Sequence, residues 1–236
     1  MNTLRIVAND PVDQHFPNIN PATNFVPDWY KKSPQNLSGT NTELVINHPI
    51  STTSTYKKCS PFLDALTSGY MIYTTCDIEV TILDNNQPYI MWRSSTRLPI
   101  TTHDNIQWEG LHKPENCHNI VYKWENNFIF NTPPGYSCLF THPLNRFDLP
   151  FYTLSGVVDT DGYSLPVKFP FFLKKGFTGV IEKNTPVAQL NFIKRENWDR
   201  TFLPFDEMKS IINSETFFSK IKRSYKNNSW KKKVYK

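Results

Sequence analysis

The sequence contains little glycine and no closely spaced cysteines. Only eight of its 236 residues are glycine, against 18 prolines. This composition excludes a flexible glycine-rich chain and favours strands and turns that are bounded by proline. The four cysteines, Cys59, Cys76, Cys117 and Cys138, are widely separated and form no Cys-x-x-Cys pair. We therefore expect free thiols in a reducing compartment rather than a disulfide framework or a zinc site.

The sequence also lacks the features of a membrane or secreted protein. It has no apolar run long enough to span a bilayer. It does not begin with a basic segment followed by an apolar one, which is the pattern of a signal peptide. These absences predict that the protein does not associate with a membrane and is cytoplasmic. For a viral protein, this means the host cytoplasm or the virion.

Positive charge is concentrated near the C-terminus. The chain has a net charge of +5, but residues 217–236 contain eight lysines and arginines and no acid. Removing these eight charges leaves −3 on the rest of the chain. A basic face spread over the whole protein, as in a nucleic-acid-binding domain, is thereby excluded. The tail is either a solvated terminus or a segment whose lysines and aromatic residues contact phosphate or nucleic acid.

The pattern of apolar residues predicts a mainly β fold. In residues 77–83, Ile78, Val80 and Ile82 would face one side of a strand and the polar residues the other. Residues 89–93 would pair back on this strand across a turn. A hairpin is predicted across residues 120–130, with its turn at Asn126-Asn127. Further strands are predicted at residues 1–8, 43–50, 69–73, 156–161, 166–169 and 187–190.

Helical patterns are confined to a few segments. Residues 24–32 and 61–66 predict short helical turns, and residues 206–226 repeat apolar residues at steps of three and four, which predicts a C-terminal α-helix. We therefore divide the chain into three parts. These are an N-terminal arm at 1–40, a β domain at 41–200, and the C-terminal helix with its basic tail at 201–236.

The β domain contains a polar stretch, residues 94–119, that has the character of an insertion. Its histidines, His103, His112 and His118, lack the short regular spacing of metal ligands. Loop polarity explains them, and no metal site is predicted.

Residues 132–195 resemble the dUTPase and dCTP deaminase superfamily. Residues 132–136 (TPPGY) are similar to its proline-proline-glycine lead-in, residues 156–163 (GVVDTDGY) to its substrate hairpin, and residues 185–190 (TPVAQL) to its late strand. A weaker resemblance extends over residues 66–131. The resemblance implies a β-clip, jelly-roll-like core and, by analogy, a trimer. The whole chain also resembles an uncharacterised family of tailed phages and bacteria.

The sequence departs from this superfamily where its enzymes bind phosphate. Residues 143–146 (PLNR) stand where the enzymes have Pro-Arg-Ser-Gly, and Met71 stands where their first motif has an aspartate. Gly162 is an additional residue before Tyr163. The C-terminal tail is rich in lysine, whereas the arm that closes over triphosphate in dUTPases is rich in glycine. Few groups are therefore available to hold a triphosphate, which requires backbone N–H groups from glycine-rich turns together with arginines.

Two classes of function are compatible with this pattern. We favour a non-catalytic binding or assembly module, which would form a homo-oligomer or join a virion or another protein partner. In this interpretation Asp159 and Asp161 build an Asx-type turn. The alternative is a nucleotide phosphohydrolase or deaminase variant, in which Asp159 activates water and Mg²⁺ is bound. A third possibility is that a nucleotide binds without being converted. The ligand-binding residues would be Asn145, Arg146, Asp161, Tyr163 and Gln189.

Overall fold

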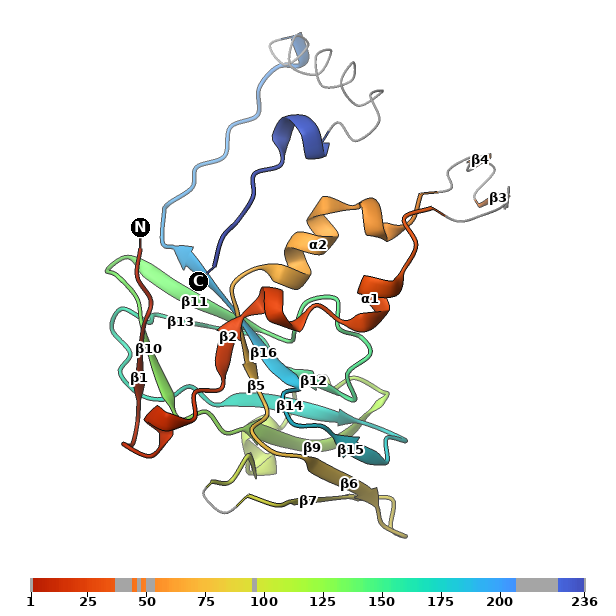
Figure 1. Cartoon of the computed structure of the whole chain (residues 1–236), viewed down its shortest axis with the longest axis vertical. Coiled ribbons are helices and arrows are strands. Elements are labelled where there is room, and N and C mark those ends of the chain that lie inside the picture. The colour runs from red at the N-terminus through yellow and green to blue at the C-terminus, as the bar shows by residue number, and fades with distance from the viewer. Residues whose placement is uncertain are drawn as a thin grey trace. The chain divides into compact units, whose positions relative to one another are not determined.

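The computed structural model describes residues 2–36, 44–45, 48–49, 54–94, 97–206 and 225–235. This part of the chain is mainly β and its strands pair antiparallel, which confirms the predicted fold class (Figure 1). Two short α-helices occur in it, α1 (Asp28–Lys32) and α2 (Ser60–Thr67), as the patterns at 24–32 and 61–66 predict. Most of the predicted C-terminal helix, residues 207–224, lies outside the described residues.

The strands form three larger sheets and two pairs within the described ranges. The five-stranded sheet has the order β13 (Gly156–Val158), β11 (Tyr136–Thr141), β16 (Pro186–Lys194), β5 (Tyr70–Tyr73) and β2 (Ile19–Pro21). The four-stranded sheet has the order β12 (Phe151–Thr153), β14 (Phe169–Lys174), β9 (Cys117–Trp124) and β8 (Ile100–Thr102). The three-stranded sheet has the order β15 (Gly179–Ile181), β6 (Ile78–Ile82) and β7 (Pro88–Trp92). The pairs are β1 (Arg5–Ala8) with β10 (Phe128–Asn131), and β3 (Leu44–Val45) with β4 (His48–Pro49).

The chain divides into two compact units, each formed from separate stretches of sequence. The first comprises residues 1–25 and 66–195, and the second comprises residues 26–65 and 196–234. The predicted N-terminal arm, residues 1–40, is therefore shared between the units. Its beginning contributes β1 and β2 to the sheets of the first unit.

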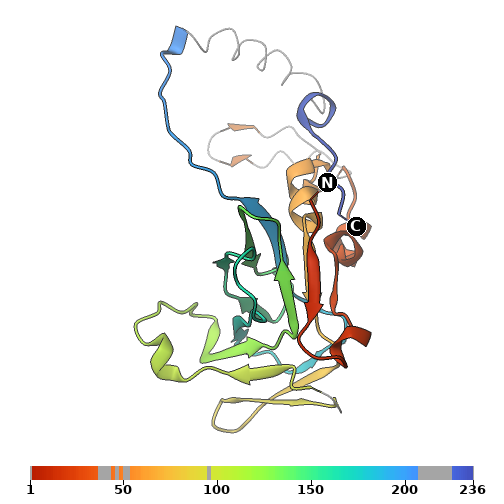
Figure 2. The same ribbon diagram turned by 90° about the vertical axis from the view of Figure 1, so that its left-hand side faces the viewer.

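The core of the first unit is built from aromatic side chains of two sheets. Trp124 of β9 stacks on Phe171 of β14 with their ring centroids 3.9 Å apart, and Phe151 of β12 meets Trp124 edge-on. The indole Nε1 of Trp124 donates to Thr153 Oγ1 at 3.3 Å, so its polar atom is satisfied inside the core. Phe140 of β11 contacts Phe169 of β14, which joins the five-stranded sheet to the four-stranded one. The backbones of these strands are drawn in Figures 1 and 2.

The second unit has an aromatic cluster of its own. Trp29 and Tyr30 of α1 contact Tyr56 and Phe62, and the Tyr30 and Phe62 rings are stacked at 5.9 Å. Trp29 therefore packs within this cluster. The described part of the basic tail also belongs to this unit. There Trp230 Nε1 donates to both carboxylate oxygens of Asp64 at 2.9 and 3.0 Å.

Three strand predictions are wrong in their pairing or bounds. Residues 120–130 do not form a hairpin, because β9 pairs with β8 and β14 whereas β10 pairs with β1. Between them the buried Asn126 side chain binds the backbone N–H and C=O of Phe128 and redirects the chain. The strand predicted at 166–169 begins only at Phe169, since Pro166 has no N–H to donate. Residues 43–50 contain two paired strands, β3 and β4, rather than one.

Candidate functional site

The turn after β13 contains the predicted catalytic residue, Asp159. Its carbonyl oxygen accepts hydrogen bonds from the N–H groups of Gly162 and Tyr163, at 3.0 and 2.9 Å. The chain does not return along β13, whose partner in the described structure is β11. The prediction of a β-hairpin at Asp159–Tyr163 is therefore wrong. The motif forms a closed turn, and Leu165-Pro166 then prevents the chain from pairing as a strand.

Both aspartates of this turn are bound to other parts of the chain. Asp161 accepts a hydrogen bond from the Gly135 N–H at 2.8 Å and forms an ion pair with Arg195. Asp159 Oδ1 accepts from Ser137 Oγ at 2.6 Å and lies 3.3 Å from Arg195 Nη1. Hydrogen bonds from the Arg195 guanidinium, and then from the Gly135 N–H, lower the pKa of Asp161 to about 2. Asp161 is therefore a poor proton acceptor.

Thr160, the residue between the two aspartates, attaches the turn to the segment before β11. Thr160 is buried, and its hydroxyl is 2.8 Å from the hydroxyl of Thr132. The Thr132 N–H donates to the Thr160 carbonyl at 3.2 Å. One side-chain and one backbone hydrogen bond between Thr160 and Thr132 thus hold the turn close to the start of β11.

Acidification should weaken the attachment of this turn. Because the pKa of Asp161 is lower in the folded protein than the ~3.9 of an unfolded chain, its ionised form stabilises the fold above that value. This contribution is lost as pH falls towards about 2. We expect the difference in Tm between the wild type and Asp161→Asn to shrink between pH ~4 and ~2. Thermal unfolding followed by circular dichroism measures it. A difference that is unchanged across this range would show that the ion pair adds no stability.

The second group of predicted residues lies in the turn after β11. The Arg146 N–H donates to the Pro143 carbonyl at 3.1 Å, and Asn145 has φ +60°. These features define a type II turn, in which the third residue has positive φ. His142 Nε2 donates to the Arg146 carbonyl at 3.0 Å, while its Nδ1 accepts from the Thr153 N–H. Burial lowers the pKa of His142, consistent with this neutral tautomer.

The groups that would hold phosphate at this turn already have partners. Arg146 is buried and binds Asp148 through two of its nitrogens, Nε and Nη2. The Leu144 N–H donates to Gln189 Oε1 at 2.8 Å. Gln189 is itself fully buried and donates to the Ser68 carbonyl at 2.7 Å. The turn therefore has the bonding of a structural corner instead of a phosphate cradle.

The two groups of predicted residues lie at opposite ends of β11. Asp161 contacts Gly135, just before the strand, whereas Gln189 pairs with Thr141, its last residue. Five residue steps separate Tyr136 from Thr141, which corresponds to about 17 Å along a strand. Asp159 and Asp161 are thus brought together, as are Asn145, Arg146 and Gln189. A single copy of the chain does not unite the two groups around one small ligand.

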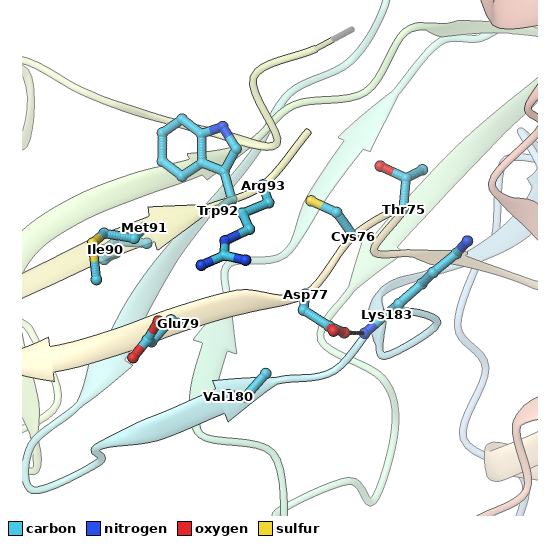
Figure 3. Close-up of a pocket in the computed structure, with 10 residues that line it drawn as sticks. All are labelled: Thr75, Cys76, Asp77, Glu79, Ile90, Met91, Trp92, Arg93, Val180 and Lys183. Carbon is cyan, nitrogen blue, oxygen red and sulfur yellow. Dashed lines mark hydrogen bonds between the residues drawn. The ribbon is translucent and has the colours of Figure 1, made fainter. Parts of the chain in front are cut away.

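No family model and no curated protein matches this chain. The superfamily resemblance therefore rests on the motif residues, whose side chains are engaged as described above. Tyr163, one of the predicted ligand-binding residues, is 43% exposed at the surface. A hollow of about 860 Å³ in the structure includes none of the predicted site residues and lies over the β15–β6–β7 sheet (Figure 3).

Two further findings concern metals and membranes. The described residues contain no group of three or more His, Cys, Asp and Glu side chains that is arranged to hold a metal ion. In the same part of the chain, no helix is both long enough and apolar enough to cross a membrane. The four cysteines are free thiols, of which Cys59 is exposed and the other three are buried.

Sequence reasoning missed the partners that engage the predicted residues. Arg195 binds Asp161 from 34 residues away, and Ser137 binds Asp159 from 22 residues away. Asp148, two residues beyond Arg146, was the one partner close enough in sequence to be proposed from spacing alone. A basic residue just after the Ala-Gln-Leu strand was the available signal for Arg195.

Proposed function

We propose that the chain is a non-catalytic binding or assembly module built on a dUTPase-like β core, and that it is phage-associated, as its resemblance to a family of tailed phages and bacteria implies. The observation that carries this proposal is that both predicted site turns use their polar groups within the chain. Asp161 pairs with Arg195, and Arg146 pairs with Asp148. A catalytic carboxylate and a phosphate-binding arginine need their bonding capacity for substrate and water.

Exposed aromatic residues support an assembly role. Trp198 and Phe202 are 87% and 88% exposed, and Phe205 lies close by in the chain. Large apolar side chains that gather on a surface mark interaction sites more often than scattered ones do. We infer a homo-oligomer as the first candidate assembly, with a virion or other protein partner as an extension. The host cytoplasm or a virion is the corresponding location.

The proposal is tested by measuring mass and turnover on the same preparation. We expect light scattering after size exclusion to give a multiple of 27.6 kDa. Incubation with a panel of nucleoside triphosphates and Mg²⁺ should give neither product nor an increase in Tm, because Asp161 and Arg146 are held in ion pairs within the chain. Asp159→Asn should behave as the wild type in both measurements. The exposed turn variant Asp84→Asn is the matched control.

Three results would contradict the proposal in different ways. Nucleotide turnover that is lost in Asp159→Asn and retained in Asp84→Asn would establish the enzyme instead. A rise in Tm with a nucleotide but without product would identify a nucleotide-binding protein. A strictly monomeric protein without a partner would contradict the assembly role.

A further inference from the structure

His142 follows β11 and binds the edge of the four-stranded sheet. Among the described strands, β12 pairs with β14 alone, so its other edge has no strand partner. The Leu154 N–H, one residue beyond β12, donates to the Pro170 carbonyl on the β14 side. Because neighbouring residues of an antiparallel strand direct their N–H groups to opposite edges, the Thr153 N–H faces the unpaired edge. Its acceptor there is His142 Nδ1, at 3.3 Å.

The second ring nitrogen of His142 is also bound to the backbone. Nε2 donates to the Arg146 carbonyl oxygen at 3.0 Å. A carbonyl only accepts and a backbone N–H only donates, so the two bonds together require a proton on Nε2 and a lone pair on Nδ1. The neutral imidazole has this arrangement, whereas the imidazolium ion has a proton on both nitrogens. A neutral side chain therefore joins the turn after β11 to the edge of β12.

The surroundings of His142 disfavour a positive charge. The Phe151 and Tyr152 rings of β12 lie beside the imidazole, with ring centroids 5.8 and 5.5 Å away. Burial among such groups is the largest cause that lowers the pKa of His142 below its ordinary value. The hydrogen bond to the Arg146 carbonyl favours a proton on the ring, but its effect is smaller than that of burial.

Three charged groups act on the imidazole. Arg146 and Asp148 belong to its own turn, and Lys174 belongs to β14. The third element packed against the ring, β12, contributes no residue that is charged near neutral pH. Arg146 and Lys174 repel an imidazolium, while Asp148, which attracts it, already binds two nitrogens of Arg146. The net charge of the three groups is positive, so protonation of His142 adds repulsion to this turn.

We propose that His142 is a pH-sensitive switch, whose neutral ring attaches the turn after β11 to β12 and whose protonation releases this attachment. A proton on Nδ1 puts a second donor where the Thr153 N–H has its acceptor. The imidazolium gains by leaving the edge of the sheet for water, and the Thr153 N–H is then open to exchange with solvent. This inference concerns the regulation of the fold and does not depend on the proposed assembly role.

The direction of the pH dependence follows from the lowered pKa. His142 gains a proton near pH ~6.5 in an unfolded chain, but only at a lower pH in the folded protein. The stability that the neutral ring contributes is therefore complete above pH ~6.5, and it is lost as the pH falls from there towards the pKa of the folded protein. The pKa of Asp161, about 2, lies well below this range, so the two effects are separable.

Amide hydrogen exchange of the wild-type protein tests the switch. The protection factor is the exchange rate of an amide in an unfolded chain divided by its rate in the protein, so it removes the intrinsic pH dependence of exchange. We expect the protection factor of the Thr153 N–H to fall at least about tenfold between about pH 7 and about pH 4.5. The amides of β6 and β7, which lie in another sheet and contain no histidine, should keep their protection. Titration of the His142 ring, followed by NMR, should have its midpoint below pH ~6.5.

The variant His142→Gln tests the role of the proton. Glutamine has an amide N–H and a carbonyl on a neutral side chain, so it offers a donor and an acceptor but gains no proton in this pH range. The protection factor of Thr153 in this variant should not change between about pH 7 and about pH 4.5. His112→Gln, which replaces an exposed histidine, is the matched control and should retain the pH dependence of the wild type.

Three outcomes would overturn the inference. Constant protection of Thr153 in the wild type would show that the ring remains in place on acidification. An equal loss of protection at Thr153 and in β6 and β7 would indicate general acid unfolding instead of a local switch. The same loss at Thr153 in His142→Gln would assign the effect to another group. The first two outcomes are measured on the wild type, so they decide the question even if His142→Gln does not fold.

Discussion

Replacing Gly69 by alanine should lower the free energy of unfolding by at least about 3 kcal/mol, or prevent folding altogether. Gly69 joins α2 to β5 with φ +68°, a left-handed conformation that glycine adopts without strain. A Cβ at this position would lie 1.8 Å from the Leu190 carbonyl oxygen and 2.9 Å from the Leu190 carbonyl carbon. Both atoms belong to the backbone of β16 at the centre of the five-stranded sheet, so neither can move without disturbing the sheet.

The control variant Gly110→Ala measures the effect of backbone strain without the steric clash that is expected at Gly69. Gly110 has φ +79°, but a Cβ there would meet no atom within 4 Å. Its substitution should therefore cost only the strain of a left-handed alanine, about 1 kcal/mol. Urea unfolding followed by tryptophan fluorescence gives both values. Equal losses in the two variants would mean that β16 does not approach Gly69 as closely as described.

Local sequence patterns predict where the strands of this protein lie better than they predict which strands pair with one another. The alternation in residues 77–83 predicts β6 correctly, because Ile78 and Val80 are buried and Glu79 is exposed. The hairpin predicted at 120–130 fails although both of its strands exist. Alternation indicates which face of a strand is buried, and it contains no information about which strand lies beside it. The buried Asn126, whose side chain turns the chain, resembles any surface turn residue in the sequence.

The same distinction between local structure and tertiary partners applies to the candidate site. The sequence predicts that Asp159 and Asp161 share a turn, which the structure contains, because Asp-Thr-Asp-Gly favours turns locally. Their engagement by Arg195 depends on β16 pairing with β11, which spacing along the chain does not reveal. The separation of Asp161 from Gln189 likewise depends on the direction and register of β11. Whether a motif is free to bind ligand is therefore a property of the tertiary structure.

Replacing Gln189 by alanine should reduce the free energy of unfolding by about 3 kcal/mol. Gln189 is fully buried in β16 and makes hydrogen bonds with the Leu144 N–H and with the carbonyl and hydroxyl of Ser68. Truncation leaves a cavity and removes the partner of the Leu144 N–H, and an unsatisfied buried donor costs about 1–3 kcal/mol. The exposed Gln87→Ala is the matched control and should change stability by less than about 0.5 kcal/mol.

This prediction also separates a structural role for Gln189 from a role in ligand binding. If the role of Gln189 is structural, Gln189→Ala lowers Tm by the same amount with and without nucleotides, because the partners of Gln189 belong to the chain. A ligand-binding glutamine would leave the stability of the free protein almost unchanged and abolish a nucleotide-dependent rise in Tm. Thermal unfolding of the wild type, Gln189→Ala and Gln87→Ala, each with and without a nucleoside triphosphate, compares the two directly. If Gln189→Ala is as stable as the wild type, the residue is available to a ligand, and the conclusion that the turn after β11 is a structural corner is wrong.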